Sequence, residues 1–182
     1  SPTVFLARTT TPQAIMPSMH SLGSASVAAL QQYVRAVQSN GTDPTPCLEA
    51  AGLDPALLDT NEGRIDGEQF QAFIRLLWEK TGNPILGLQT GDFVQPGSYS
   101  VLGYITMSCA TLGEAVARIA PFEKLVGDMG KTHLEMQGDR IKLSWTCQYD
   151  DPVVRPQLVD NVFASWINYA RWLGDRDDAS PA

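Results

Sequence analysis

The stretch HLEMQGDRIKLSWTC, residues 133–147, decides the fold of this 182-residue chain. Apolar and polar residues alternate on both sides of Gly138-Asp139, which is typical of two strands joined by a tight turn. The sequence therefore predicts a β-hairpin with one apolar face. A lone hairpin is only marginally stable in water, so other elements must cover that face. We expect further strands from Thr3–Ala7 or from a region beyond this chain.

Around the hairpin, apolar residues recur at helical spacing. Helices are expected over 27–38, 67–81, 103–108, 112–126 and 157–173, with short ones after Asp43 and Asn83. Ser26, Asp66 and Thr111 are predicted caps. Pro121 predicts a kink or a restart, because proline in a helix interior costs about 3 kcal/mol. Residues 92–100 are expected to form a loop. The predicted class is α+β, mostly helical, with an antiparallel β-hairpin or small sheet packed against helices.

Three parts are expected along the chain. Residues 1–24 lack periodicity and predict a flexible N-terminal arm, with packing of the arm on a partner as the alternative. Residues 25–174 form the expected globular domain, which we expect to be incomplete on its C-terminal side. Gly174 is predicted to end the last helix, so residues 175–182 are a polar tail.

Composition excludes several function classes. Thirteen basic and twenty acidic residues give a net charge of −7, which opposes binding to nucleic acid or to an anionic membrane surface. No apolar run approaches the roughly 18–20 residues that span a bilayer. The three cysteines are widely spaced, which favours a reducing cytoplasm over an exported, disulfide-linked protein.

The residues offer no recognised catalytic, metal or cofactor motif. The only histidines are His20 and His133, and neither has a partner at a recognised spacing. Cys109 and Cys147 are interpreted as core residues. A binding module remains, with an apolar pocket between the sheet and the helices. Candidates to line it are Phe93, Tyr104, Met107, Met136 and Trp145, with plain core or surface positions as the alternative for all five.

Several short segments, taken in order, resemble a known family. They are Thr81-Gly82-Asn83-Pro84, Gly87–Gly91, Leu102-Gly103-Tyr104, Thr111–Ala115 and the Gly138-Asp139 hairpin. This order resembles the N-terminal, arabinose-binding-like effector domain of AraC-type transcription regulators, over about residues 43–174. The resemblance implies a cytoplasmic bacterial regulator that binds a small-molecule effector, either amino-acid-like or fatty-acid-like. It also implies that DNA is contacted only by a C-terminal helix-turn-helix domain absent from this chain.

The resembled family carries no catalytic residues to transfer, and we expect no cofactor. We further expect a homodimer, formed through the 158–173 helix, although the apolar stripe of that helix could instead cover the hairpin. Two alternatives are kept open. One is a small hydrolase that uses Cys109 or Cys147 with His133, and the other is a protein-interaction scaffold without a ligand.

Overall fold

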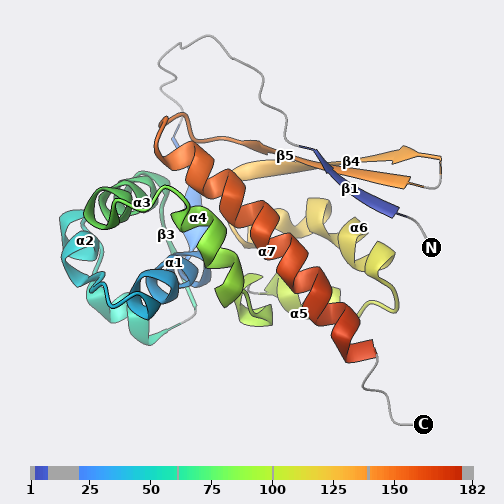
Figure 1. The fold of residues 1–182 in the computed structure, drawn as a ribbon, viewed down its shortest axis with the longest axis horizontal. Coiled ribbons are helices and arrows are strands. Elements are labelled where there is room, and N and C mark those ends of the chain that lie inside the picture. Colours follow the sequence, from blue (N-terminus) through green and yellow to red (C-terminus); the bar gives the residue numbers. More distant parts are fainter. Residues whose placement is uncertain (1–2, 8–20, 61, 100, 139, 178–182) are drawn as a thin grey trace.

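The computed structural model describes residues 3–7, 21–60, 62–99, 101–138 and 140–177. It confirms the α+β class (Figure 1). The order of elements is β1 (Thr3–Ala7), β2 (Ser24–Ser26), α1 (Val27–Ser39), α2 (Thr45–Ala50), η1 (Pro55–Asp59), β3 (Arg64–Asp66), α3 (Gly67–Thr81), α4 (Leu86–Gln89), η2 (Thr90–Phe93), η3 (Pro96–Tyr99), α5 (Val101–Met107), α6 (Leu112–Phe122), η4 (Glu123–Leu125), β4 (Gly130–Gln137), β5 (Arg140–Cys147) and α7 (Val154–Asp177).

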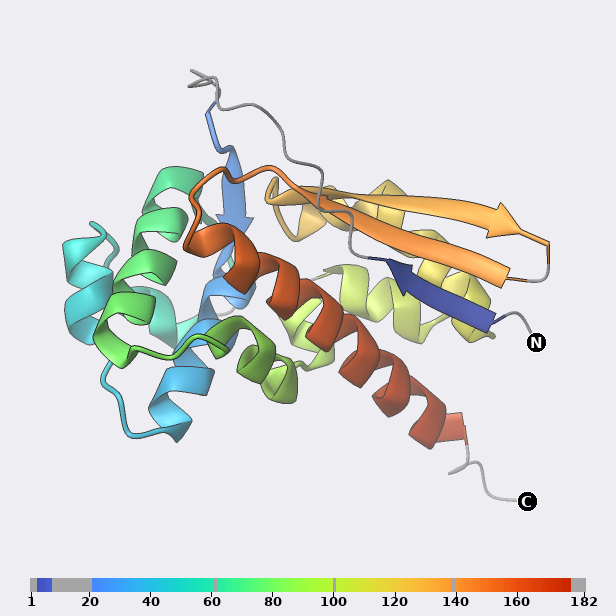
Figure 2. The same ribbon diagram turned by 45° about the horizontal axis from the view of Figure 1, so that its top comes forward.

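The predicted hairpin is confirmed as β4 and β5, paired antiparallel from Gly130–Cys147 to Gln137–Arg140. The expected third strand is β1, which pairs with the other edge of β5 in parallel. A second antiparallel pair, β2 with β3, has no signal in the sequence, because each strand is only three residues long. Figures 1 and 2 show the three-stranded sheet with α6 against it and the cluster α1–α4 to one side.

The predicted helix starts are confirmed by capping hydrogen bonds. The Ser26 hydroxyl accepts from the amide of Ala29 at 3.1 Å, and the Asp66 carboxylate accepts from Glu68 at 2.9 Å. The Thr111 hydroxyl likewise accepts from Glu114 at 3.2 Å. These contacts satisfy amide groups that have no partner inside the helix, which is why polar residues of this kind begin helices.

Three predicted boundaries are wrong. The last helix does not span 157–173, because α7 begins at Val154 and continues through Gly174 to Asp177. Pro156 fits in its first turn, where amide groups lack intrahelical partners in any case. The stretch 92–100 is not an irregular loop throughout, since the 3₁₀ turns η2 and η3 occupy much of it. The helix expected over 112–126 ends at Phe122, where the 3₁₀ turn η4 follows, so its predicted end is wrong while the break expected at Pro121 is present.

The main core lies between α1, α3 and α7. Tyr33, Phe70 and Tyr149 are all fully buried and meet edge to face, with ring centroids 6.0 and 6.4 Å apart. The helix α4 approaches α7 so closely that a Cβ on Gly87 would lie 2.0 Å from the Gln157 carbonyl oxygen. Helix α7 also contacts β5 and α6, and it therefore joins the helical cluster to the sheet.

Candidate functional site

A cavity opens where α7, the hairpin, α1 and the α6–β4 connection meet. The centres of water molecules can occupy about 70 Å³ of it, which is room for several waters or for a ligand of several heavy atoms. Its lining is mostly apolar with a few polar groups, the usual character of small-molecule sites. The lining residues are Ala29, Gln32, Ser98, Leu102, Ile119, Glu123, Val126, Gly127, Met129, Gly130, Thr132, Trp145, Asn161, Val162, Ser165 and Trp166.

The hairpin supplies the wall that Trp145 dominates. Thr132 on β4 and Trp145 on β5 are direct cross-strand partners, so their side chains leave the same face of the sheet. The Trp145 ring lies directly over Gly130, because a Cβ there would be 2.2 Å from the ring atom Cζ2. Gly130 therefore leaves room for the indole against the strand, while Trp145 still borders the cavity.

A network of polar side chains, all buried except the half-buried Asn161, forms the wall between α1 and α7. The Gln32 amide donates to the Thr90 carbonyl at 2.9 Å and to the Ser165 hydroxyl at 2.6 Å. The Asn161 amide donates to the Thr90 hydroxyl at 2.6 Å. Buried amides tied down in this way keep one orientation, so this wall is rigid and its polar atoms are positioned before any ligand arrives.

Glu123 and Thr132 form the polar end of the cavity. A Glu123 carboxylate oxygen accepts from the Thr132 amide at 2.7 Å. Burial raises the pKa of Glu123, while its contacts with Thr132 and the charges of His133 and Lys131 oppose that shift. The Thr132 hydroxyl is buried and lacks a hydrogen bond of good geometry among the described residues, although it lies near enough to the carboxylate to favour its ionised form. The polar end thus holds an ionisable carboxyl and a hydroxyl with spare hydrogen-bonding capacity.

The segment beneath the cavity is tied to the second sheet. The Ser26 amide donates to the Val126 carbonyl at 2.8 Å, and the Asp128 amide donates to the Ser24 carbonyl at 2.8 Å. Gly127, which lines the cavity, bridges to Ala25. Any displacement of the 126–128 segment is therefore transmitted to β2.

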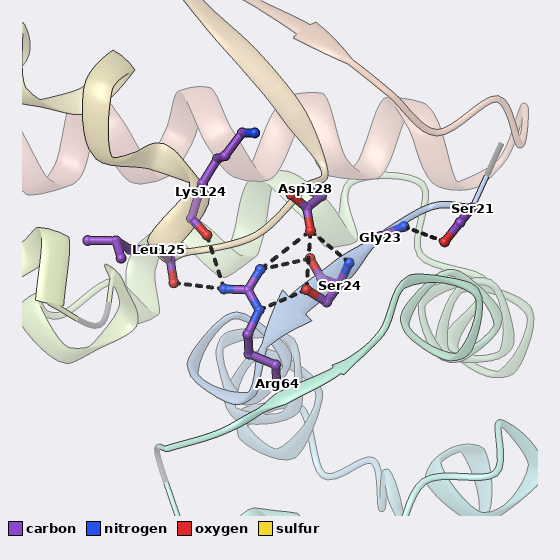
Figure 3. Close-up of polar contacts among 7 residues, drawn as sticks. All are labelled: Ser21, Gly23, Ser24, Arg64, Lys124, Leu125 and Asp128. Atoms are coloured by element: carbon purple, nitrogen blue, oxygen red, sulfur yellow. Dashed lines mark hydrogen bonds and ion pairs between the residues drawn. The ribbon is translucent and has the colours of Figure 1, made fainter.

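Figure 3 shows how Arg64 on β3 strengthens this connection. Its guanidinium donates to the carbonyl oxygens of Lys124 at 3.0 Å and Leu125 at 3.3 Å, and to the Ser24 hydroxyl at 2.7 Å. It also forms an ion pair with Asp128 at 3.5 Å. A planar donor group with several N–H bonds can join separate backbone segments in this way, whereas a single ammonium cannot match that geometry.

The sequence of this chain is similar to that of known proteins. Residues 41–182 match the family described as the arabinose-binding domain of AraC transcription regulators, N-terminal, which covers more than half of the chain. The chain belongs to this AraC effector-domain family. The Ornithine utilization regulator of Pseudomonas aeruginosa is 26% identical over 117 residues, or 64% of this chain. The aligned part is 34% of that protein, so this chain spans about a third of its curated relative.

Within this AraC-type domain, one of the five pocket candidates lines the cavity. Trp145 does so, whereas the other four lie elsewhere. Phe93 is half-buried against the core, Met107 is half-buried on α5, and Tyr104 is 63% exposed. Met136 is 68% exposed, because the helices cover the hairpin near Trp145 and leave its turn end uncovered.

Most of the polar residues that line the cavity were not predicted from the sequence. Thr132 had a signal, since it continues the alternation of the predicted strand towards the N-terminus and therefore shares a face with Trp145. Glu123 had none, because it follows a helix interrupted by proline. No sequence signal indicated Gln32 and Ser165 either, because they lie 133 residues apart and meet only when α7 packs on α1.

The cysteine–histidine arrangement of the hydrolase alternative is not formed on the hairpin. His133 pairs with Ser144, whereas Cys147 pairs with Gly130 and therefore leaves the opposite face. Burial also raises the pKa of the Cys147 thiol to about 11, which disfavours the reactive thiolate. The Cys109 thiol donates to the Ile105 carbonyl, and no hydrogen bond within the described residues joins it to His133.

Across residues 3–7, 21–60, 62–99, 101–138 and 140–177, no three His, Cys, Asp or Glu side chains come together as a metal site. The helices of the same described part include none with the length and hydropathy of a membrane span. His20 lies outside the described residues.

Proposed function

We propose that this chain is the effector-sensing part of a cytoplasmic AraC-type transcription regulator, and that the cavity beside Trp145 is the effector site. The observation that carries the proposal is the cavity itself, in which apolar walls surround a few preorganised polar groups. In the proposal a helix-turn-helix domain beyond this chain contacts DNA. The acidic net charge of −7 supports this division, because the contact with phosphate is left to another domain.

The proposed mechanism is a shift between two conformations of the domain. A ligand that binds one of them more tightly shifts the population towards it, and the attached DNA-binding domain responds. Two elements that line the cavity can transmit this shift. One is α7, which contributes Asn161, Val162 and Ser165, and the other is the 126–128 segment tied to β2.

A thermal-shift screen of amino-acid-like and fatty-acid-like metabolites tests the proposal. A ligand at a hundredfold its Kd stabilises the native state by about 2.7 kcal/mol, or roughly 5–10 °C in Tm for a domain of this size. Val162→Trp fills the cavity from α7 and should abolish the shift. Ala117→Trp is the matched control, since it adds a tryptophan at an exposed position of α6 that lies outside the lining and away from the exposed part of α7. A shift that survives in Val162→Trp would contradict this site.

We further propose that the regulator is a homodimer and that the exposed part of α7 contributes to the interface. Leu158 and Phe163 are buried in the core, so the apolar stripe of this helix mainly covers the protein interior. Ile167 and Trp172 remain 38% and 37% exposed towards its C-terminal end. Sedimentation over a wide concentration range should show a dimer that Ile167→Lys weakens. A monomer at every concentration would contradict this part of the proposal.

A further inference from the structure

The charge of the cavity lining is one-sided. Of the residues that line it, Glu123 alone has an ionisable carboxyl, and the described lining holds no Lys, Arg or His. Lys131 and His133 lie on either side of Thr132 along β4, so their side chains leave the opposite face of the strand, and both are exposed. These side chains, like that of exposed Lys124, therefore lie outside the lining and reach solvent, although the charges of Lys131 and His133 still act on Glu123 from behind the strand.

The Glu123 carboxylate is positioned as an acceptor. Its contact with the Thr132 amide holds the side chain in one orientation, and one oxygen atom serves that bond. The adjoining Thr132 hydroxyl can accept as well as donate. Two acceptors side by side in a partly buried, low-dielectric place favour a ligand group that has several N–H donors and a positive charge.

The remaining lining suits an uncharged body. Trp145, Leu102, Val162 and Trp166 supply apolar and aromatic surface beside the polar end. A carboxylate ligand would bring a second negative charge beside Glu123 without a cation in the lining to balance it, and like charges in such a place repel.

We infer that the effector is an amine: its protonated amino group lies between the Glu123 carboxylate and the Thr132 hydroxyl, and its aliphatic or aromatic body lies against Trp145 and Trp166. The inference rests on the proposed effector function of the cavity. The lining therefore disfavours fatty acids. A free amino acid also fits less well than the corresponding amine, because its carboxylate has no cationic partner in the lining.

Three probes of matched shape test the inference on the full chain: n-pentylamine, 1-pentanol and pentanoate. Their binding is followed by tryptophan fluorescence, to which Trp145 and Trp166 in the lining contribute, and by calorimetry. Pentylamine should bind about 10- to 100-fold more tightly than either partner, the usual effect of a hydrogen bond to a charged group. Ornithine is added as a zwitterionic comparison and should bind more weakly than its decarboxylated analogue, putrescine.

Glu123→Gln removes the charge with little change of shape. It should weaken pentylamine binding about 10- to 100-fold and leave pentanol binding unchanged. Glu135→Gln is the control, because it makes the same change of net charge on β4 with a side chain that is 61% exposed. In the unaltered chain, amine affinity should fall as the pH drops through the pKa of Glu123, which burial places above 4.5. This pH profile keeps the test decisive if the variant does not fold.

Each outcome decides between the two proposals. Tight pentylamine binding that depends on Glu123 supports the inference. If pentanoate or pentanol binds as well as the amine, and Val162→Trp abolishes that binding, the cavity remains the effector site and the inference about ligand class is wrong. If no probe binds at millimolar concentration, the inference is also wrong. Failure of every metabolite in the thermal-shift screen would in addition overturn the proposed function.

Discussion

Gly130→Ala places a methyl group where the structure has no room for one. The new Cβ would lie 2.2 and 2.3 Å from two atoms of the Trp145 indole and 2.6 Å from the Thr146 carbonyl oxygen. Carbon atoms in contact normally lie about 3.5–4.0 Å apart, so either the ring or the strand must move by more than an ångström. Trp145 is 7% exposed and belongs to the core cluster, and the ring therefore cannot move freely.

The expected loss in the free energy of unfolding follows from two opposing effects. Overpacking a well-packed region costs about 1–3 kcal/mol, and the conflict with a backbone oxygen favours the upper part of that range. Replacing glycine by alanine restricts the unfolded chain and returns about 0.4–1 kcal/mol. We expect a net destabilisation of roughly 2 kcal/mol, or about 4–8 °C in Tm. Displacement of Trp145 should also weaken ligand binding in the cavity.

Urea unfolding followed by far-UV circular dichroism and tryptophan fluorescence measures this loss. Gly113→Ala is the matched control, since a Cβ there would meet only the Thr111 hydroxyl oxygen, at an ordinary 3.8 Å. Because Gly113 lies in the first turn of α6, this variant should be neutral or slightly more stable. If Gly130→Ala unfolds at the same urea concentration as the unaltered chain, the packing argument is wrong, and with it the described position of Trp145.

Three more perturbations have defined outcomes. Arg64→Met should lower the free energy of unfolding by about 1–2 kcal/mol through loss of the hydrogen bonds to η4. High salt should change this loss little, because the exposed ion pair with Asp128 contributes little to stability. A loss that disappears in high salt would refute the reasoning. Asp151→Ala should cost about 2 kcal/mol at neutral pH, since the carboxylate caps α7 and contacts Arg75 at 2.7 Å. Burial opposes ionisation of Asp151, but its contacts with Arg75 and with the amides at the start of α7 outweigh burial and hold its pKa below 3.8. The difference in the free energy of unfolding between the unaltered chain and Asp151→Ala should therefore vanish as the pH falls through that pKa. Burial raises the pKa of the Cys147 thiol from 9.0, its ordinary value, to about 11 in the fold. The free energy of unfolding should therefore fall as the pH rises from 9 to 11, and Cys147→Ala should remove that part of the pH dependence. An unchanged pH profile in Cys147→Ala would show that another group causes the effect.

Local signals predicted most of the secondary structure because they act over a few residues. The alternation in residues 133–147 and the turn at Gly138 define the hairpin without help from the rest of the chain. The same holds for Ser26 and Asp66, whose side chains cap helices two or three residues away. Such signals are not decisive at every position. Gly174, for example, does not end α7, which continues three residues further.

The sequence by itself determined the class of the protein, its hairpin, its helices and its acidic charge. Only the tertiary structure decided where the cavity lies and which side chains line it. Gln32 meets Ser165 across 133 residues, and Arg64 meets Leu125 across 61. The direction of β1 beside β5 was likewise set by packing. The physical reason is that capping and strand alternation depend on the neighbouring backbone, whereas a binding cavity exists only where surfaces from distant segments meet and fail to fill the space between them.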